Sequence, residues 1–206
     1  MRRAHGAILR RTASRAGAAP QEEDFTMDDL RIVSSELRAY RDGAEISGCG
    51  LRVVSVSDEA SDTALVADFS LTVSFYKKQR RLMALGKAGL AQGNAAKPNG
   101  LHRKEVVSFF VSTETGEHTF APKNFIQSEE KGYLLGGDED VVSAANLLNE
   151  VVNGTKLQLG ISGKGDAVSR IFSFTPEIEK ADAQSYLACI DAFLKYAGQD
   201  STSKGE

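Results

Sequence analysis

The 206-residue chain is long enough to form one domain with a sizeable hydrophobic core, and its 41% hydrophobic and 26% charged residues are typical of a soluble globular protein. The net charge of -3 argues against the strongly basic surface of most nucleic-acid-binding proteins. No apolar run approaches the roughly 18 residues that a membrane-spanning helix needs, so the sequence predicts no transmembrane segment.

Residues 1–24 are expected to lie outside the fold. They are rich in Arg and Ala, as an organelle presequence is, and "AGAAP" before an acidic stretch resembles a signal-peptidase site. The apolar stretch of about 7–15 residues that a secretory signal requires is missing. Three interpretations stay open: a disordered basic tail, an organelle-targeting segment, or a wrongly assigned start codon that hides a signal peptide.

Residues 28–76 predict three strands. The pattern of 28–43 fits either a strand or a helical stripe, and we favour a strand because β-type segments follow it. The next segment places Cys49, Leu51 and Val53 on one face of a strand. In "DFSLTVSFY", apolar residues alternate strictly with polar ones, as in an antiparallel strand with one core face and one solvent face. The polar "DEASDT" between these two strands predicts a hairpin.

Residues 105–174 predict further hairpins. "EVVSFFVST" and "HTFAP" are joined by "ETGE", and Val107, Phe109 and Val111 are expected to face inward. "NFIQSEEKGYLLGG" predicts another strand, regular or bulged. "KLQLGIS" alternates cleanly and returns through the turn "GKGD" into "AVSRIFSF".

Two amphipathic helices are predicted, at about 138–153 and 180–197. Acidic residues begin the first helix and Gly154 follows it, as is usual at helix ends. In the second, Tyr186, Cys189 and Phe193 form one apolar stripe, and Gly198 is expected to end it. The elements together predict an α+β fold, mainly an antiparallel β sandwich or curled sheet built from hairpins, with the helices packed on it. Residues 25–198 would form this single domain and 199–206 a disordered tail.

Cys49 and Cys189 are the only cysteines, and both are predicted to face inward. A disulfide between them would close a loop of about 140 residues and stabilise the fold by about 4–5 kcal/mol in the chain-entropy treatment. It would also require an oxidising compartment. The alternative is two free cysteines acting as small apolar core residues.

No motif predicts a metal, a cofactor or a catalytic centre. His5, His102 and His118 have no partners at zinc-binding spacings. "GISGKGD" fits neither a phosphate-binding loop nor a nucleophile elbow, and "GGDEDV" lacks the alternating ligands of a calcium loop. A hydrolase whose site is assembled across the fold, with His102 or His118 as the base, is kept as an alternative.

The segment 76–104 contains the most distinctive local pattern, because its eight Lys and Arg residues come with no acid. It could form a short helix, a strand or a loop. Its proposed partner-binding residues are Lys77, Lys78, Arg80, Arg81, Lys87, Arg103 and Lys104. They suit an acidic protein or another anionic surface, whereas nucleic acid is disfavoured because stacking aromatic residues are missing. The alternative is a solvated loop whose lysines protect a sheet edge.

These patterns favour a non-enzymatic binding protein that uses a basic loop surface for an acidic partner. A paired Cys49 and Cys189 and a hidden signal would make it an exported bacterial protein, periplasmic or secreted. Otherwise we expect a cytoplasmic or organellar location, with a scaffold subunit as the alternative function. The sequence indicates no oligomeric state.

Overall fold

The computed structural model describes residues 26–27, 30–59, 63–76, 81–94, 97, 99–167 and 169–202. The expected N-terminal segment 1–24 lies outside these residues. The elements within them are β1 (Thr26–Met27), β2 (Leu30–Asp42), β3 (Glu45–Glu59), β4 (Thr63–Tyr76), β5 (Arg81–Gly93), β6 (Leu101–Lys104), β7 (Val106–Thr113), β8 (Thr119–Phe120), β9 (Asn124–Gln127), β10 (Tyr133–Asp138), α1 (Val141–Val152), β11 (Leu157–Gly163), β12 (Arg170–Phe174) and α2 (Lys180–Thr202).

The strands form two sheets. The large sheet has the order β2-β3-β4-β5-β10-β9, with β6 paired to β5, and the small sheet has the order β1-β12-β11-β7-β8. The pairs are antiparallel except for β1 with β12. The chain therefore has the predicted α+β fold, mostly antiparallel strands with two helices.

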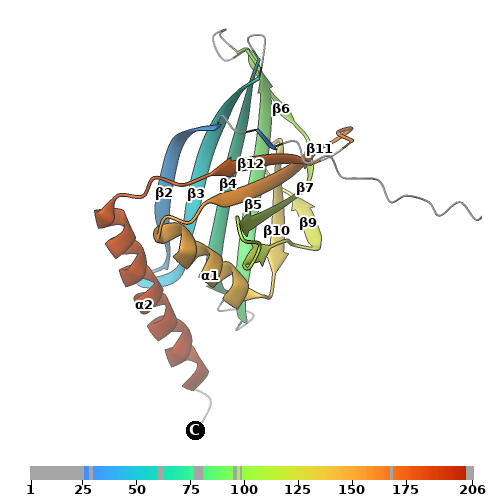
Figure 1. Ribbon diagram of the computed structural model, residues 1–206. Coiled ribbons are helices and arrows are strands. Elements are labelled where there is room, and N and C mark those ends of the chain that lie inside the picture. The colour runs from blue at the N-terminus through green and yellow to red at the C-terminus, as the bar shows by residue number, and fades with distance from the viewer. Residues whose placement is uncertain are drawn as a thin grey trace, which may run out of the picture.

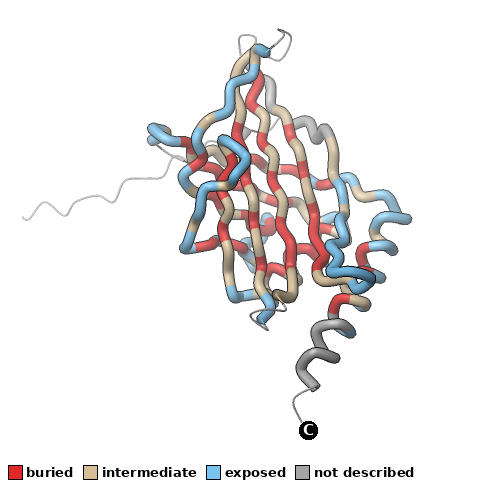
Figure 2. The backbone as a smooth tube through the Cα atoms, turned by 180° about the vertical axis from the view of Figure 1, so that it is seen from behind, coloured by how far each residue is buried: buried red, intermediate tan, exposed pale blue. Residues whose placement is uncertain are grey.

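The small sheet and both helices lie on one side of the large sheet, and the strands of the small sheet cross those of the large one at a steep angle (Figure 1). α1 contacts β4, β5, β7 and β8, while α2 contacts β3 and β2. We call this covered side of the large sheet the inner face. The opposite side, the outer face, is in plain view in Figure 2.

The core fills the space between the layers. Phe69, Leu71 and Val73 of β4 are at most 1% exposed, which confirms the strict alternation in the sequence. Leu51 and Val53 of β3 are each 2% exposed and point the same way. One buried cluster joins these residues with side chains from the small sheet and from both helices. Burial of this apolar surface is the main source of stability.

One residue that was predicted to face the core is exposed instead, so that prediction is wrong. Val107 on β7 is 45% exposed, and its neighbour Val106 is 1% exposed in its place. The pairing of β7 with β11 shifts here, so that Gly163 faces Val106 and Val107 is skipped. A bulge of this kind interrupts the alternation of a strand. Beyond it, Phe109 and Val111 face the core as predicted, at 3% and 0% exposed.

The structure defines the secondary structure of two other segments more closely than the sequence did. The predicted strand in 124–137 is a hairpin of two strands, β9 and β10, which pair antiparallel. The basic segment 76–104 contains no helix among its described residues, because Arg81–Gly93 forms β5 between β4 and β10 and Leu101–Lys104 forms β6. Small residues such as Gly86 and Ala88 face inward on this strand. A larger side chain would not fit at Gly86, since a Cβ there would collide with the rings of Phe109 and Phe120.

Both helices form close to where they were predicted. The carboxylate of Asp140 accepts a hydrogen bond from the backbone N–H of Ser143 at 3.0 Å and so caps α1. On α2, the stripe of Tyr186, Cys189 and Phe193 is buried. The helix continues beyond Gly198 to Thr202. A glycine within a helix costs only about 1 kcal/mol relative to alanine, so the predicted stop at this residue was too early.

Cys49 on β3 and Cys189 on α2 lie at disulfide-bonding distance, and their Cα atoms are 6.0 Å apart. Cys49 is 0% exposed and Cys189 is 5% exposed. The pair connects the last helix to the interior of the large sheet across a sequence separation of 140 residues. Pairing rather than two separate core cysteines is therefore the arrangement in the structure.

Candidate functional site

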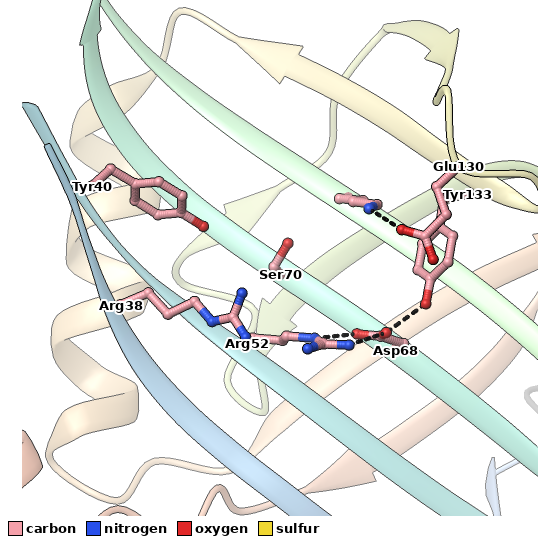
Figure 3. Close-up of a pocket in the computed structure, with 8 residues that line it drawn as sticks. Arg38, Tyr40, Arg52, Asp68, Ser70, Glu130 and Tyr133 are labelled. Atoms are coloured by element: carbon pink, nitrogen blue, oxygen red, sulfur yellow. Dashed lines mark hydrogen bonds and ion pairs between the residues drawn. The ribbon is translucent and has the colours of Figure 1, made fainter. Parts of the chain in front are cut away.

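The outer face of the large sheet carries a polar hollow of about 280 Å³. The residues that line it are Arg38, Tyr40, Arg52, Asp68, Ser70, Lys87, Glu130 and Tyr133. Figure 3 shows Arg38 and Tyr40 on one side, Tyr133 and Glu130 on the other, and Ser70 between them. Five strands and the turn before β10 thus contribute to one site.

Cross-strand pairing brings these residues together. Arg52 on β3 faces Glu36 on β2 and Ser70 on β4. Ser70 in turn faces Lys87 on β5. Directly opposed residues of antiparallel strands point to the same side of the sheet. One row of outward side chains therefore crosses four strands, with Ser70 between two cationic residues.

A glycine makes room beside this row. Gly50 on β3 lies between Arg38 on β2 and Thr72 on β4. A Cβ built on Gly50 would collide with the carbonyl oxygen of Leu71 and the hydroxyl of Thr72. The close approach of β3 and β4 therefore requires glycine here.

Asp68 is the best-satisfied polar group of the hollow. Arg52 donates to both of its carboxylate oxygens, from Nε at 2.9 Å and from Nη2 at 2.7 Å, and the Tyr133 hydroxyl donates to Oδ2 at 2.6 Å. Burial alone would raise the pKa of Asp68, but the hydrogen bonds from Arg52 and Tyr133 outweigh it and lower that pKa. The same environment, burial first and then the bond to Asp68, raises the pKa of Tyr133 to about 12. This bidentate pair is a rigid part of the floor.

Two cations lie against the ring of Tyr133. Lys87 Nζ lies 4.3 Å and Arg103 Cζ 4.5 Å from the centroid of its ring, as in cation–π contacts. Both cations also pair with Glu130, at 2.7 Å from Lys87 and 3.2 Å from Arg103. The hydrogen bond from Lys87 is the main cause of a lowered pKa at Glu130. Two positive charges here are balanced by a single carboxylate.

Two hydroxyl groups in the hollow have no hydrogen-bond partner within the described part of the chain, namely those of Tyr40 and Ser70. Arg38 lies beside them and donates through Nε and Nη2 to Glu36, at 3.1 and 2.6 Å. Both hydroxyls can donate a hydrogen bond to an incoming oxygen. The centre of the hollow therefore offers donors, whereas its carboxylates are already occupied.

The hollow and its rim carry one cation more than carboxylates. The cations are Arg38, Arg52, Lys87 and Arg103, and the carboxylates are Glu36, Asp68 and Glu130. Each of these carboxylates pairs with at least one of the cations. An additional anion would meet a local excess of positive charge, whereas an additional cation would not.

The structure separates the predicted basic residues. Lys87 and Arg103 meet at Tyr133, as described above. Arg81 pairs with Glu139 at 2.9 Å, and Lys104 pairs with Asp166 at 2.8 Å in another part of the surface. Lys77, Lys78 and Arg80 lie outside the described residues, so their role stays a prediction. The described members form no continuous basic loop; two of them belong to the hollow.

The neighbours of His102 and His118 bear on the hydrolase alternative. His102 is exposed on β6 and faces Gln92 on β5. His118 lies 3.5 Å from a carboxylate oxygen of Glu150 on α1. Neither ring hydrogen-bonds to a hydroxyl or thiol among the residues that the structure describes. The two histidines that the structure describes therefore form no nucleophile–base pair that would support the hydrolase alternative, and His5 lies outside the described residues.

A second, more apolar hollow of about 740 Å³ lies beside the first on the outer face. Its apolar lining comes from Tyr76, Met83, Leu85, Ile126 and Leu135. Leu135 faces Lys87 across the β5–β10 pair, so the two hollows adjoin at this point. The outer face is thus polar over β3 and β4 and apolar over β5 and β10.

Sequence reasoning missed Arg38, Arg52, Asp68 and Tyr133. The sequence contained a usable signal for Arg52 and Asp68. A hairpin centred on residue 61 places Arg52 opposite Ser70 and next to Asp68. No comparable signal pointed to Tyr133, because residues 94–132 separate β10 from β5 in the sequence.

Among the described residues, no group of three or more His, Cys, Asp or Glu side chains is arranged to hold a metal ion. Every helix in that part of the chain is too short or too polar to cross a membrane. No protein-family model, no curated protein and no solved structure matches this chain.

Proposed function

We propose that this chain is a non-enzymatic binding protein whose polar hollow holds a carboxylate of an acidic partner. The observation that carries the proposal is the pair of unpartnered hydroxyls, Tyr40 and Ser70, set among cations while the neighbouring carboxylates are already paired. A carboxylate placed over Ser70 would lie between Arg52 and Lys87 in the same row. The proposal keeps the acidic partner expected from the sequence and moves its site from a loop to a sheet face.

The rigidity of the floor supports this function. Arg52 is fixed by two hydrogen bonds to Asp68, and Tyr133 is fixed by Asp68, Lys87 and Arg103. A ligand that binds to groups already held in place loses less side-chain entropy. Because Lys87 and Arg38 are partly exposed, each charge contributes little alone and is screened by salt. An extended acidic chain, with several carboxylates, suits such a site better than a single small anion.

The test is a ¹H–¹⁵N NMR titration of the full chain with an oligoglutamate peptide, and with oligoglutamine as the uncharged probe. We expect saturable shifts centred on Ser70, Lys87 and Tyr133 with oligoglutamate alone, weakening as salt is added. Lys87→Gln should reduce the affinity several-fold. Lys164→Gln is the matched control, because Lys164 is also paired with one glutamate, at 2.9 Å, but lies in a distant turn.

Two results would overturn the proposal. One is an oligoglutamate titration without shifts at the hollow. The other is equal loss of affinity in Lys87→Gln and Lys164→Gln, which would mean that only overall charge matters.

A further inference from the structure

The border of the large sheet at β2 differs from the other sheet borders. β2 has 13 residues, whereas the terminal strands β9, β1 and β8 have 4, 2 and 2. Figure 1 shows β2 running along one side of the sheet. Short edge strands are a common protection against pairing with another chain, and β2 lacks that protection.

The backbone of β2 pairs with β3 only. In the described part of the chain no other segment forms a backbone hydrogen bond with it. α2 contacts β2, and the Ser35 hydroxyl donates to the carbonyl oxygen of Glu177 before that helix. Among the described residues, none of these contacts pairs the outward N–H and C=O groups of the run from Ser34 to Tyr40. About half of the backbone groups of an edge strand point away from the sheet.

The regular part of β2 has a defined centre. The pairing with β3 shifts between Ile32 and Ser34 and again between Tyr40 and Arg41. The run from Ser34 to Tyr40 lies between these two irregularities, and Leu37 is its middle residue. A two-fold axis through Leu37 would align this run with its own copy over its whole length.

That axis makes the outward charges complementary. In an antiparallel pair related by it, Glu36 faces Arg38 of the second copy, and Arg38 faces Glu36 of the second copy. Both side chains are about half exposed, at 48% and 43%, and lie on the outer face. An axis through Arg38 instead would oppose Glu36 to Tyr40, and one through Ala39 would oppose it to Asp42. Among the registers in which both opposed residues lie within Ser34–Tyr40, only the one about Leu37 gives two opposite-charge pairs.

We propose that β2 pairs antiparallel with β2 of a second copy about Leu37, so that two large sheets join into one continuous sheet. Glu36 and Arg38 already pair within one chain at 2.6 Å, so forming the dimer exchanges this partner rather than leaving a charge unpaired. The two polar hollows would lie on the same outer face, on either side of the axis. The inference is independent of the hollow's ligand, because it rests on the strand edge.

The experiment is sedimentation velocity of the full chain over a wide concentration range, with two charge-reversal variants. Glu36→Arg puts arginine opposite arginine twice, and Arg38→Glu does the same with glutamate. Each variant alone should dimerise about tenfold more weakly than the natural chain, since like charges directly opposed destabilise a strand pair. An equimolar mixture of the two variants should recover dimers, because every opposed pair is again of opposite charge.

The mixture also controls for folding, because a misfolded variant would not regain dimerisation on mixing. Lys87→Gln should weaken oligoglutamate binding and leave the dimer intact, which separates this inference from the proposed function. A natural chain that stays monomeric at the highest soluble concentration overturns the inference. So do dimers that persist in both single variants, or a mixture that stays monomeric.

Discussion

On β4, Phe69 points into the core and is 1% exposed, while the next residue, Ser70, lies in the polar hollow on the outer face. The same alternation repeats on β3, where Leu51 is buried and Arg52 pairs with Asp68 outside. On the inner face, side chains gain stability by leaving water. On the outer face, charged groups remain partly hydrated and are held by one another. A substitution at an inward residue should therefore change stability, whereas a substitution at the neighbouring outward residue should change the candidate site.

The largest expected effect is on the inner face. Phe69→Ala should lower the free energy of unfolding by about 3–5 kcal/mol, because it removes a fully buried ring and leaves a cavity. Ser70→Ala, its neighbour on the outer face, should change it by less than about 0.5 kcal/mol. Urea unfolding followed by circular dichroism measures both. Similar losses in the two variants would mean that the outer face is as important for stability as the core.

A smaller loss of stability is expected when the disulfide between β3 and α2 is removed. Replacing Cys49 and Cys189 together by alanine should cost about 2–4 kcal/mol, which is the usual range for a disulfide and lies below the chain-entropy value for this long loop. Differential scanning calorimetry of the variant and the natural chain, without reductant, gives the difference. The oligoglutamate shifts should persist in the variant below its melting temperature. Loss of those shifts in a folded variant would show that the inner link also positions the outer hollow.

The smallest effect concerns pH and the outer face alone. The pKa of Asp68 is lowered in the folded state, so the stability that this group contributes is complete above its unfolded value near 3.8. That contribution is lost as the pH falls below this value through the folded pKa, because the unfolded chain then binds the proton first. In Asp68→Asn the free energy of unfolding should depend less steeply on pH in this acidic range, by up to about 1.4 kcal/mol per pH unit.

Glu139→Gln provides the comparison for the acidic range, since this exposed carboxylate also pairs with an arginine, at 2.9 Å. Its side chain is 78% exposed, so solvent screens the pair and little stability is expected to depend on it. Equal slopes in Asp68→Asn and the natural chain would contradict the role assigned to the Arg52–Asp68–Tyr133 group.

Much of the inner face was predictable, because burial leaves a period-two pattern in the sequence. Phe69, Leu71 and Val73 followed that pattern, and the stripe containing Cys189 followed the helical one. Val107 did not, since a bulge depends on how β11 pairs with β7 and leaves no mark in the spacing of β7 itself. Local periodicity thus predicts which face is buried only where the strand pairing is regular.

The outer face was much less predictable. Its charged residues come from strands far apart in sequence, and a lone Arg or Asp at a solvent position looks like any other surface residue. The basic block in 77–104 pointed to a positively charged surface. In the structure, Arg81, Lys87, Arg103 and Lys104 pair instead with Glu139, Glu130 and Asp166 from distant segments. Such partners become visible only when the order of the strands is known.

The bond between Cys49 and Cys189 also has a mechanical consequence. Tension applied to the two ends of the chain would pass through β2, cross the sulfur atoms and leave through the end of α2. The segment between the two cysteines, which contains β4, β5 and the whole small sheet except β1, would carry none of it. Pulling could peel β2 and the last turns of α2 from the protein, while the closed loop that contains most of the core stayed folded until the bond was reduced.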